Sequence, residues 1–163
     1  MFDVLTYPAP KLREVAKPVT DFDDVLRNHV EAMFDTMYHD HGCGLAATQV
    51  GLFSRVFVMD TSRDRSNPIC VINPEILSLE GKVVSEEGCL SFPGVYAKVN
   101  RSKVITVRFQ DLSGSFQELT LEGLASHCVQ HETDHLNGKL FIDYLSPMKR
   151  ERLLKKMSKI QRL

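Results

Sequence analysis

Features that mark membrane, repetitive and disordered proteins are absent from this sequence of 163 residues. Its apolar stretches are far shorter than the roughly 20 residues that a helix needs to cross a bilayer, and we expect no membrane partner. The chain has no internal repeat and no low-complexity tract. Hydrophobic residues make up 43% of the chain and charged residues 25%. These values predict one globular domain that is large enough to bury a core.

Cysteine is scarce as well, with four residues in the chain. No two of them have the CxxC spacing of many zinc and redox sites, and no signal peptide is recognisable. A disulfide framework is therefore not expected, and the predicted compartment is the reducing cytoplasm.

Residues 131–135 have the sequence His-Glu-Thr-Asp-His, an HExxH pattern. The apolar spacing around it and the Asn137-Gly138 stop signal predict a helix. Residues four apart lie on one face of a helix, so His131 and His135 can bind one metal ion. Glu132 can then reach a water on that metal. The pattern predicts a metal-activated water that attacks a carbonyl group.

His127 lies one turn before this pair. At a rise of about 1.5 Å per residue, His127 and His135 are roughly 12 Å apart, and metal–nitrogen bonds near 2 Å cannot span that distance. We therefore expect His127 to be a pocket-wall or polar-surface histidine and not a ligand of the same metal. The apolar residues expected to support the helix from behind are Leu124, Ala125, Val129 and Leu136.

A catalytic site of this type needs a third protein ligand. Cys89 is the best candidate, because the two glycines and the proline in residues 88–94 let the backbone turn tightly and approach a ligand closely. Cys70 lies in an apolar run typical of a core strand. The local sequence alone allows two interpretations of Cys89: it is a metal ligand, or it is a small buried side chain.

Residues 42–51 are rich in glycine and small side chains, which suggests a backbone against which another molecule docks. No GK[ST] sequence follows, so the segment is not a phosphate loop. Gln49 carries an uncharged amide that can donate hydrogen bonds to a developing oxyanion. The alternative is that Gln49 only caps backbone groups in a tight loop.

Three segments, in this order, resemble the motifs of the peptide deformylase family. Residues 42–49 resemble its GxGLAATQ motif, residues 87–91 its EGCLS motif and residues 130–136 its QHExDHL motif. Tyr7-Pro8 with Leu12-Arg13 resembles its N-terminal signature, so the resemblance covers roughly residues 1–145. One departure is Cys43, where the family more often has an aliphatic residue.

The resemblance implies a hydrolase that removes the N-formyl group from the formyl-methionine of new polypeptides and releases formate. It implies one metal ion bound by Cys89, His131 and His135. Ligand type alone favours zinc, whereas the resemblance implies Fe²⁺, with Zn²⁺, Ni²⁺ or Co²⁺ able to replace it.

The resemblance also implies the roles of other residues. Glu132 would transfer protons, and the Gln49 amide with the Leu90 N–H would stabilise the oxyanion. The peptide would lie extended beside residues 42–45 and 87–89, with the methionine in an apolar pocket. The residues expected to bind it are Gly42, Cys43, Gly44, Glu87, Gly88, His127 and Cys128.

Two other classes of protein compete with this reading. Zinc endopeptidases with an HExxHxxGxxH motif need a third histidine at the position of Phe141, and others need a downstream glutamate, for which only Glu151 is available. A non-catalytic protein with a structural metal would need a fourth protein ligand, and none is evident.

The pattern of elements predicts the fold class. A helix is expected over residues 22–38, and strands over 55–59, 70–72, 77–84, 103–110 and 116–121, with a turn at Ser113-Gly114. Strands that follow one another without βαβ alternation predict an α+β fold with antiparallel sheets. The resemblance implies that these sheets surround the central metal-binding helix.

Residues 146–163 predict a basic C-terminal helix that extends the catalytic domain of residues 1–145. Ser146 is a good N-cap and Pro147 suits the first turn. This segment has a formal charge of +6, so residues 1–145 carry −7. The helix is either an ordinary solvated surface or a site for a phosphate backbone. The resemblance favours the ribosome near its exit tunnel as partner, not DNA. We predict that deleting residues 148–163 leaves turnover of a free formyl-Met peptide largely intact but weakens ribosome binding.

Overall fold

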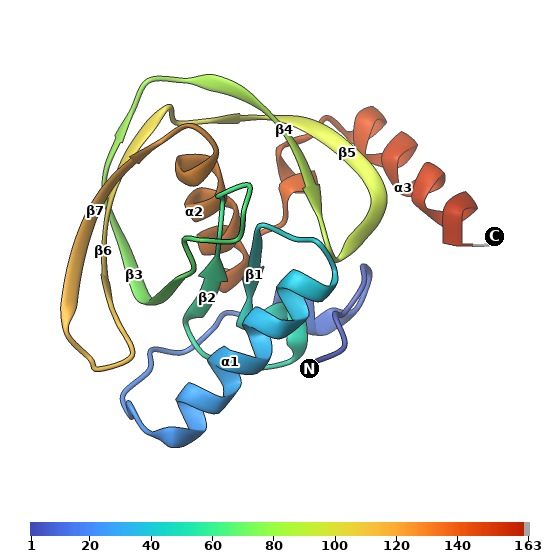
Figure 1. Ribbon diagram of the computed structural model, residues 1–163. Helices are drawn as coiled ribbons and strands as arrows, with labels where there is room; N and C mark the ends of the chain where they lie inside the picture. The colour runs from blue at the N-terminus through green and yellow to red at the C-terminus, as the bar shows by residue number, and fades with distance from the viewer. Residues whose placement is uncertain (162–163) are drawn as a thin grey trace.

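The computed structural model describes residues 1–161, and Arg162 of the predicted basic helix lies outside the described residues. Helix α2 (Gly123–Leu136) occupies the centre, and two antiparallel sheets curve around it (Figure 1). Helices α1 (Asp24–His39) and α3 (Pro147–Gln161) pack outside the sheets. The prediction of an α+β fold with antiparallel sheets around a central helix, and with a C-terminal helix, is confirmed.

The larger sheet has five strands in the order β1-β2-β3-β6-β7, and each neighbouring pair is antiparallel. Its strands are β1 (Gly44–Ala46), β2 (Val56–Met59), β3 (Ile69–Glu80), β6 (Val104–Gln110) and β7 (Phe116–Glu122). The second sheet is the hairpin of β4 (Val83–Cys89) and β5 (Phe92–Arg101). Three short 3₁₀ helices complete the described part: η1 (Pro10–Arg13), η2 (Ala47–Val50) and η3 (Phe141–Tyr144).

Helix α1 begins two residues later than residue 22, where it was expected. The Asp23 side chain accepts a hydrogen bond from the Leu26 N–H at 3.0 Å and thereby caps the helix. The buried apolar residues of α1 recur every three to four positions, as one apolar face requires; they are Leu26, Val30, Met33 and Met37.

The expected strands 70–72 and 77–84 have different bounds. Residues 69–80 form one strand, β3, and the chain reverses at Gly81, whose φ of +70° suits glycine. The ladder of β3 shifts register between Ile72 and Glu75, a bulge that accommodates the Asn73-Pro74 pair. Asn73 compensates for the interrupted ladder, because its side chain bonds the N–H and C=O of Val19 at 2.8 and 2.9 Å.

The hairpin of β4 and β5 was not predicted. Its strands pair Cys89 with Phe92, so the chain reverses over Leu90-Ser91. Gly88, expected in a turn, lies within β4. The hairpin places Cys89 at the end of a strand that faces α2 (Figure 1).

Helix α2 is anchored in the core by Val129 and Leu136, both with 0% of their surface exposed. The expectation that Leu124 supports the helix from behind is wrong. Leu124 is 56% exposed and lines the cleft described below, because it lies in the first turn of α2.

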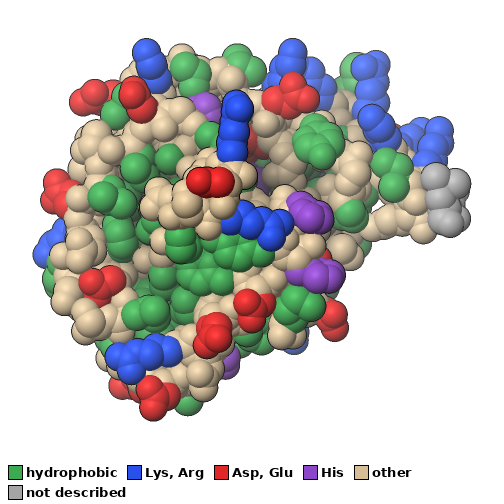
Figure 2. All heavy atoms as spheres, viewed as in Figure 1, with side chains coloured by type: hydrophobic (Ala, Val, Ile, Leu, Met, Phe, Trp, Pro, Cys, Tyr) green, Lys and Arg blue, Asp and Glu red, His purple; other side chains and the backbone are tan. Residues whose placement is uncertain are grey.

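Helix α3 packs along β5 and buries Leu153 and Met157 in a cluster that includes Phe92, Val95 and Val99. Its outer face carries lysine and arginine side chains, which gather on this part of the surface (Figure 2). Within residues 1–161, no helix combines the length and the apolar character needed to span a membrane.

Candidate metal centre and active-site cleft

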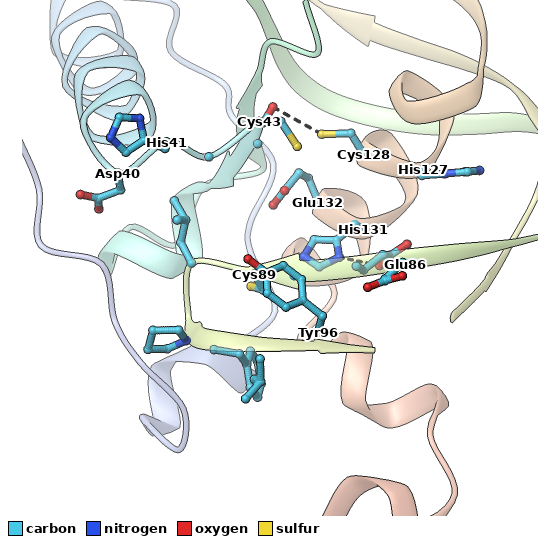
Figure 3. Close-up of a pocket in the computed structure, with 18 of the residues that line it drawn as sticks. Asp40, His41, Cys43, Glu86, Cys89, Tyr96, His127, Cys128, His131 and Glu132 are labelled. Atoms are coloured by element: carbon cyan, nitrogen blue, oxygen red, sulfur yellow. Dashed lines mark hydrogen bonds and ion pairs between the residues drawn. The ribbon is translucent and has the colours of Figure 1, made fainter. Parts of the chain in front are cut away.

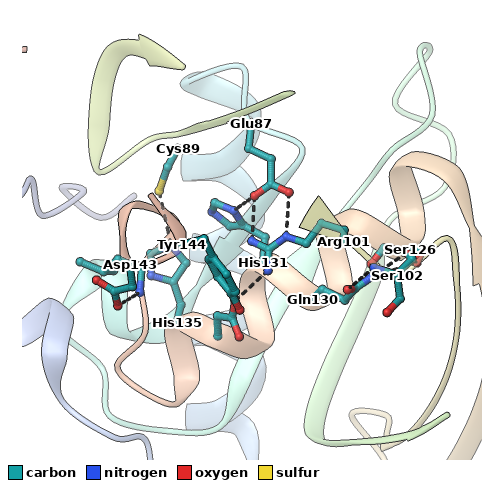
Figure 4. Close-up of polar contacts among 12 residues, drawn as sticks. Glu87, Cys89, Arg101, Ser102, Ser126, Gln130, His131, His135, Asp143 and Tyr144 are labelled. Carbon is teal, nitrogen blue, oxygen red and sulfur yellow. Dashed lines mark hydrogen bonds and ion pairs between the residues drawn. The ribbon is translucent and has the colours of Figure 1, made fainter. Parts of the chain in front are cut away.

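Two separate parts of the chain bring three metal-binding side chains together. Cys89 comes from the end of β4 and His131 from α2 (Figure 3), and His135 lies one turn further along the same face of α2 (Figure 4). One ligand atom of each lies within 4.8 Å of the others, and Cys89 Sγ is 3.3 Å from His135 Nε2. A tetrahedral metal with bonds of about 2.0–2.3 Å keeps its ligand atoms roughly 3.5 Å apart. The group therefore fits a single metal ion.

A buried network orients His131 (Figure 4). His131 Nδ1 is 2.9 Å from Glu87 Oε1, which leaves Nε2 free to face the metal. Arg101 donates to both oxygens of Glu87 at 2.8 Å and to Asp134 at 2.8 Å. The Tyr144 hydroxyl donates to Asp134 at 2.7 Å. Such outer partners fix the ring orientation of a metal ligand.

Glu87 was expected to bind the peptide, but its carboxylate is engaged elsewhere. Burial raises its pKa, but the hydrogen bonds from Arg101 and His131 outweigh this effect and lower the pKa of Glu87 to about 2. The carboxylate is thus ionised and held by two partners. Glu87 lines the cleft, while its charge orients the metal site.

The electrostatics of the two histidines suit a cation. Burial, followed by the proximity of His131, lowers the pKa of His135 well below its usual value, so that His135 is neutral. Burial opposes charge on His131 too, but hydrogen bonds to Cys89 and Glu87 raise its pKa. The neutral imidazole of His135 can therefore donate its lone pair to a metal, and a divalent cation would displace the proton that the raised pKa keeps on His131.

Glu132 lies beside this group with an unused oxygen. Its side chain is buried, and Oε1 has no hydrogen-bond partner among residues 1–161. Burial raises the pKa of Glu132 to about 7, a value suited to proton transfer near neutral pH. A Cβ at position 44 would collide with Glu132 Oε2 and lie 2.7 Å from Cys128 Sγ. Only glycine at position 44 lets the backbone pass this close to the carboxylate.

Gln49 caps a backbone group and also places its amide nitrogen near Cys89. Its Oε1 accepts the Ala46 N–H at 2.9 Å, so the side chain does cap a backbone group. Its Nε2 donates to Ser91 Oγ at 3.1 Å and lies 3.5 Å from Cys89 Sγ. The amide is therefore held rigidly with its nitrogen beside the metal ligands. Leu90 follows Cys89 in the hairpin turn and also lines the cleft.

A cleft of about 510 Å³ opens onto Glu132 and His131 (Figure 3). All the residues expected to bind peptide line it: Gly42, Cys43, Gly44, Glu87, Gly88, His127 and Cys128. His127 Nε2 is buried without a partner among the described residues.

The cleft and the polar network around α2 also contain residues that were not expected from the sequence. Phe92 and Tyr96 come from β5, a strand without strict apolar alternation, so no local signal pointed to them. Arg101 was missed because only the hairpin brings it to Glu87. Gln130 has a local signal, its place in the QHExDHL segment, and it ties α2 to the turn after β5 by bonds of 2.9 Å to the Ser102 N–H and C=O.

The polypeptide deformylase family model matches residues 1–151. The chain belongs to the peptide deformylase family. It is 50% identical to the peptide deformylase of Stutzerimonas stutzeri, and the match covers 99% of this chain and 97% of the relative. Identity to peptide deformylase 1 of Pseudomonas syringae pv. tomato is also 50%, over 100% and 98% of the two chains.

Solved structures agree with this membership. The crystal structure of a peptide deformylase from Legionella pneumophila superposes with a TM-score of 0.97 at 46% identity, covering 99% of this chain and 96% of that one. A peptide deformylase from Synechococcus elongatus in complex with actinonin gives a TM-score of 0.93 at 39% identity, over 96% and 88%. The family predicted from the sequence motifs is confirmed.

The protein is therefore an enzyme, a metal-dependent deformylase that removes the N-formyl group from nascent polypeptides. The two competing classes, a zinc endopeptidase and a non-catalytic binding protein, are excluded.

Proposed function

We propose that this deformylase acts on N-terminal formyl-methionine with Cys89, His131 and His135 as ligands of one divalent metal. Glu132 is the proton-transfer group in this proposal. The observation that carries it is the convergence of three ligand atoms beside a buried carboxylate whose Oε1 is unpartnered within residues 1–161.

A metal bound by these three residues would lower the pKa of a coordinated water toward neutrality. Glu132 accepts the proton of the water that attacks the formyl carbon, and it later returns the proton to the departing amine. The Gln49 amide and the Leu90 N–H donate hydrogen bonds to the developing oxyanion, and losing one such donor typically costs about 10²–10³ in rate. Glu87 and Arg101 keep His131 in one orientation throughout.

The cleft supplies the binding site for the substrate in this proposal. The peptide lies extended between residues 42–45 and the hairpin residues 87–89, and Gly88 keeps that edge open. The methionine side chain enters the part lined by Leu124, His127 and Cys128. A thioether adapts well to such an irregular wall.

We propose Fe²⁺ as the native metal, with Zn²⁺, Ni²⁺ and Co²⁺ as substitutes. One thiolate and two imidazoles accept all four ions, so ligand type does not discriminate among them. The resemblance to the family supports iron.

We further propose that the enzyme works in the cytoplasm and docks on the ribosome near its exit tunnel through α3, an extension of the catalytic domain of residues 1–145. The exposed basic residues of this helix are Lys149, Arg152, Lys155, Lys156 and Lys159. Their charge suits the phosphate backbone of RNA, and formylated chains emerge at that place.

Two substitutions separate the proposed roles. Cys89→Ala removes one of three ligands, so the purified protein should retain little metal. Glu132→Gln leaves all three ligands, so it should keep its metal but release almost no formate from a formyl-Met tripeptide. Metal analysis on anaerobically purified protein, paired with formate release, measures both effects.

Cys70→Ala is the matched control, because Cys70 lies in β3 and does not line the cleft. It should retain both metal and activity. If Cys89→Ala kept one metal per chain with normal turnover, the ligand assignment would be wrong.

A further inference from the structure

Two free thiols meet in the wall of the cleft. Cys43 is exposed and precedes β1, whereas Cys128 is buried in α2. Cys128 Sγ lies 3.6 Å from the Cys43 carbonyl oxygen, and a Cβ built on Gly44 would lie 2.7 Å from the same sulfur. Figure 3 shows the two side chains together beside Glu132. The backbone of residues 43–44 is thus already in contact with the Cys128 thiol.

The two thiols differ in reactivity. A hydrogen bond from Cys128 lowers the pKa of Cys43, while the same contact and burial raise the pKa of Cys128. Cys43 is therefore both the more accessible thiol and the one that ionises more easily, and the thiolate is the form that reacts with oxidants. By contrast, burial raises the pKa of Cys70 to about 12.

We propose that Cys43 is a site of reversible oxidation by hydrogen peroxide, and that Cys128 completes the modification by forming an intramolecular disulfide with it. Neither step is part of deformylation.

The chemistry balances with peroxide as the only oxidant. The Cys43 thiolate attacks one peroxide oxygen, the O–O bond breaks, and sulfenic acid and hydroxide form. The Cys128 sulfur then attacks the sulfenic sulfur, the S–S bond forms and a second hydroxide leaves. The two thiol protons convert both hydroxides to water. The sulfurs together lose two electrons, which the peroxide gains, and a dithiol reductant reverses the bond by exchange.

The disulfide would obstruct the active site. An S–S bond of about 2.05 Å requires Cys128 Sγ to leave the Cys43 carbonyl and draws residues 43–44 toward α2. Gly44 already lies against Glu132, so this movement displaces the carboxylate and narrows the cleft. The expected result is loss of most of the deformylase activity until the bond is reduced. This effect on activity rests on the proposed role of Glu132, whereas formation of the disulfide does not.

The test uses the zinc-loaded holoenzyme, because Zn²⁺ has no redox chemistry of its own and occupies the Cys89 thiol. The protein is treated with hydrogen peroxide, alkylated and mapped by mass spectrometry without reduction. Formate release is measured before treatment, after treatment and after addition of dithiothreitol. We expect a cross-linked peptide pair containing Cys43 and Cys128, which forms in step with the loss of activity and disappears with dithiothreitol.

Three variants make the test specific, each compared with its own untreated sample. Cys43→Ser should retain most of its activity after peroxide and form no cross-link. Cys128→Ser should also form no cross-link, while a sulfenic-acid trap labels its Cys43. Cys70→Ser is the matched control and should respond as the parent does.

Three results would overturn the proposal: inactivation of the parent without the cross-link, equal inactivation of Cys43→Ser, or a cross-link that leaves activity unchanged. Absence of formate release before treatment would instead contradict the proposed function. The peptide map tests the disulfide independently of that outcome.

Discussion

At the residue scale, the active site depends on how closely the backbone of β1 approaches α2. At Gly44 the missing side chain leaves room for the Glu132 carboxylate and for Cys128 Sγ. Glu132 is buried, and a Cβ added at position 44 would collide with its Oε2. In the proposed mechanism, proton transfer requires this carboxylate to be within hydrogen-bond reach of the water. A single methyl group at position 44 should therefore disturb the chemistry more than the fold.

We predict that Gly44→Ala lowers kcat by about 10²-fold, since a misplacement of about 1 Å in a catalytic group can cost that much. The added methyl should reduce the free energy of unfolding by about 1–3 kcal/mol, as overpacking usually does. Steady-state kinetics on a formyl-Met peptide and urea unfolding measure the two effects.

Gly42→Ala is the matched control within the same segment. Its new Cβ would lie 2.8 Å from the flexible Leu90 side chain and 3.5 Å from the Gly44 carbonyl oxygen, which is an ordinary contact, so its kcat should fall far less. Equal kcat values for the two variants would show that the close approach at Gly44 does not matter.

At the scale of elements, the C-terminal end of α1 is fastened to the end of β2. Tyr38, in the last turn of α1, donates a hydrogen bond of 2.6 Å to Asp60, which follows β2. The Asp60 N–H in turn bonds the Cys43 carbonyl at 2.9 Å, so this contact also supports the segment that enters the cleft. Burial and then the hydrogen bond to Asp60 raise the pKa of Tyr38 to about 12.

The raised pKa has a defined consequence for stability. Because Tyr38 is neutral when bonded to Asp60, its contribution is complete below the ordinary tyrosine pKa near 10 and is lost as the pH rises toward about 12. Tyr38→Phe should lower the free energy of unfolding by about 1 kcal/mol near neutral pH. Above about pH 10, the free energy of unfolding of Tyr38→Phe should also decrease less with pH than that of the parent.

Urea unfolding of parent and variant across an alkaline pH series measures this difference. Tyr96→Phe serves as control, because Tyr96 is 68% exposed, and it should follow the parent. Parallel pH profiles for parent and Tyr38→Phe would contradict the assigned role of the hydrogen bond.

Some secondary-structure elements could be predicted from the sequence, and others could not. The helix of His131 and His135 was predictable, because a spacing of four residues places both rings on one face without any tertiary information. The β4–β5 hairpin was not, because its glycines and proline suggested an irregular turn. The ion pair of Glu87 and Arg101 could not be predicted either, because the two residues are 14 positions apart and are brought together by the pairing of β4 with β5. The continuous strand β3 was missed because the Asn73-Pro74 bulge has the sequence of a strand end.

At the scale of the whole molecule, charge is divided between the body and α3. Residues 146–163 carry +6 and the remainder −7, so a polyanionic partner would be attracted to α3 and repelled elsewhere. Deleting α3 is a poor test of this, because Leu153 and Met157 would leave the core cluster that supports β5. Loss of that support would disturb the cleft residues Phe92 and Val95, which is contrary to the sequence-based expectation that such a deletion spares turnover. Neutralising exposed charges tests the helix without removing its packing.

We predict that the triple variant Lys155→Gln, Lys156→Gln, Lys159→Gln binds ribosomes more weakly than the parent, with unchanged kcat on a free formyl-Met peptide. Each lost phosphate contact should also reduce the slope of log affinity against log salt by about 1. Co-sedimentation with ribosomes across a salt series provides both quantities. The control is Lys11→Gln, Lys82→Gln, Lys103→Gln, which removes the same charge from exposed positions outside α3 and should bind as the parent does. Equal weakening by the two triple variants would mean that net charge, and not α3, directs the enzyme to the ribosome.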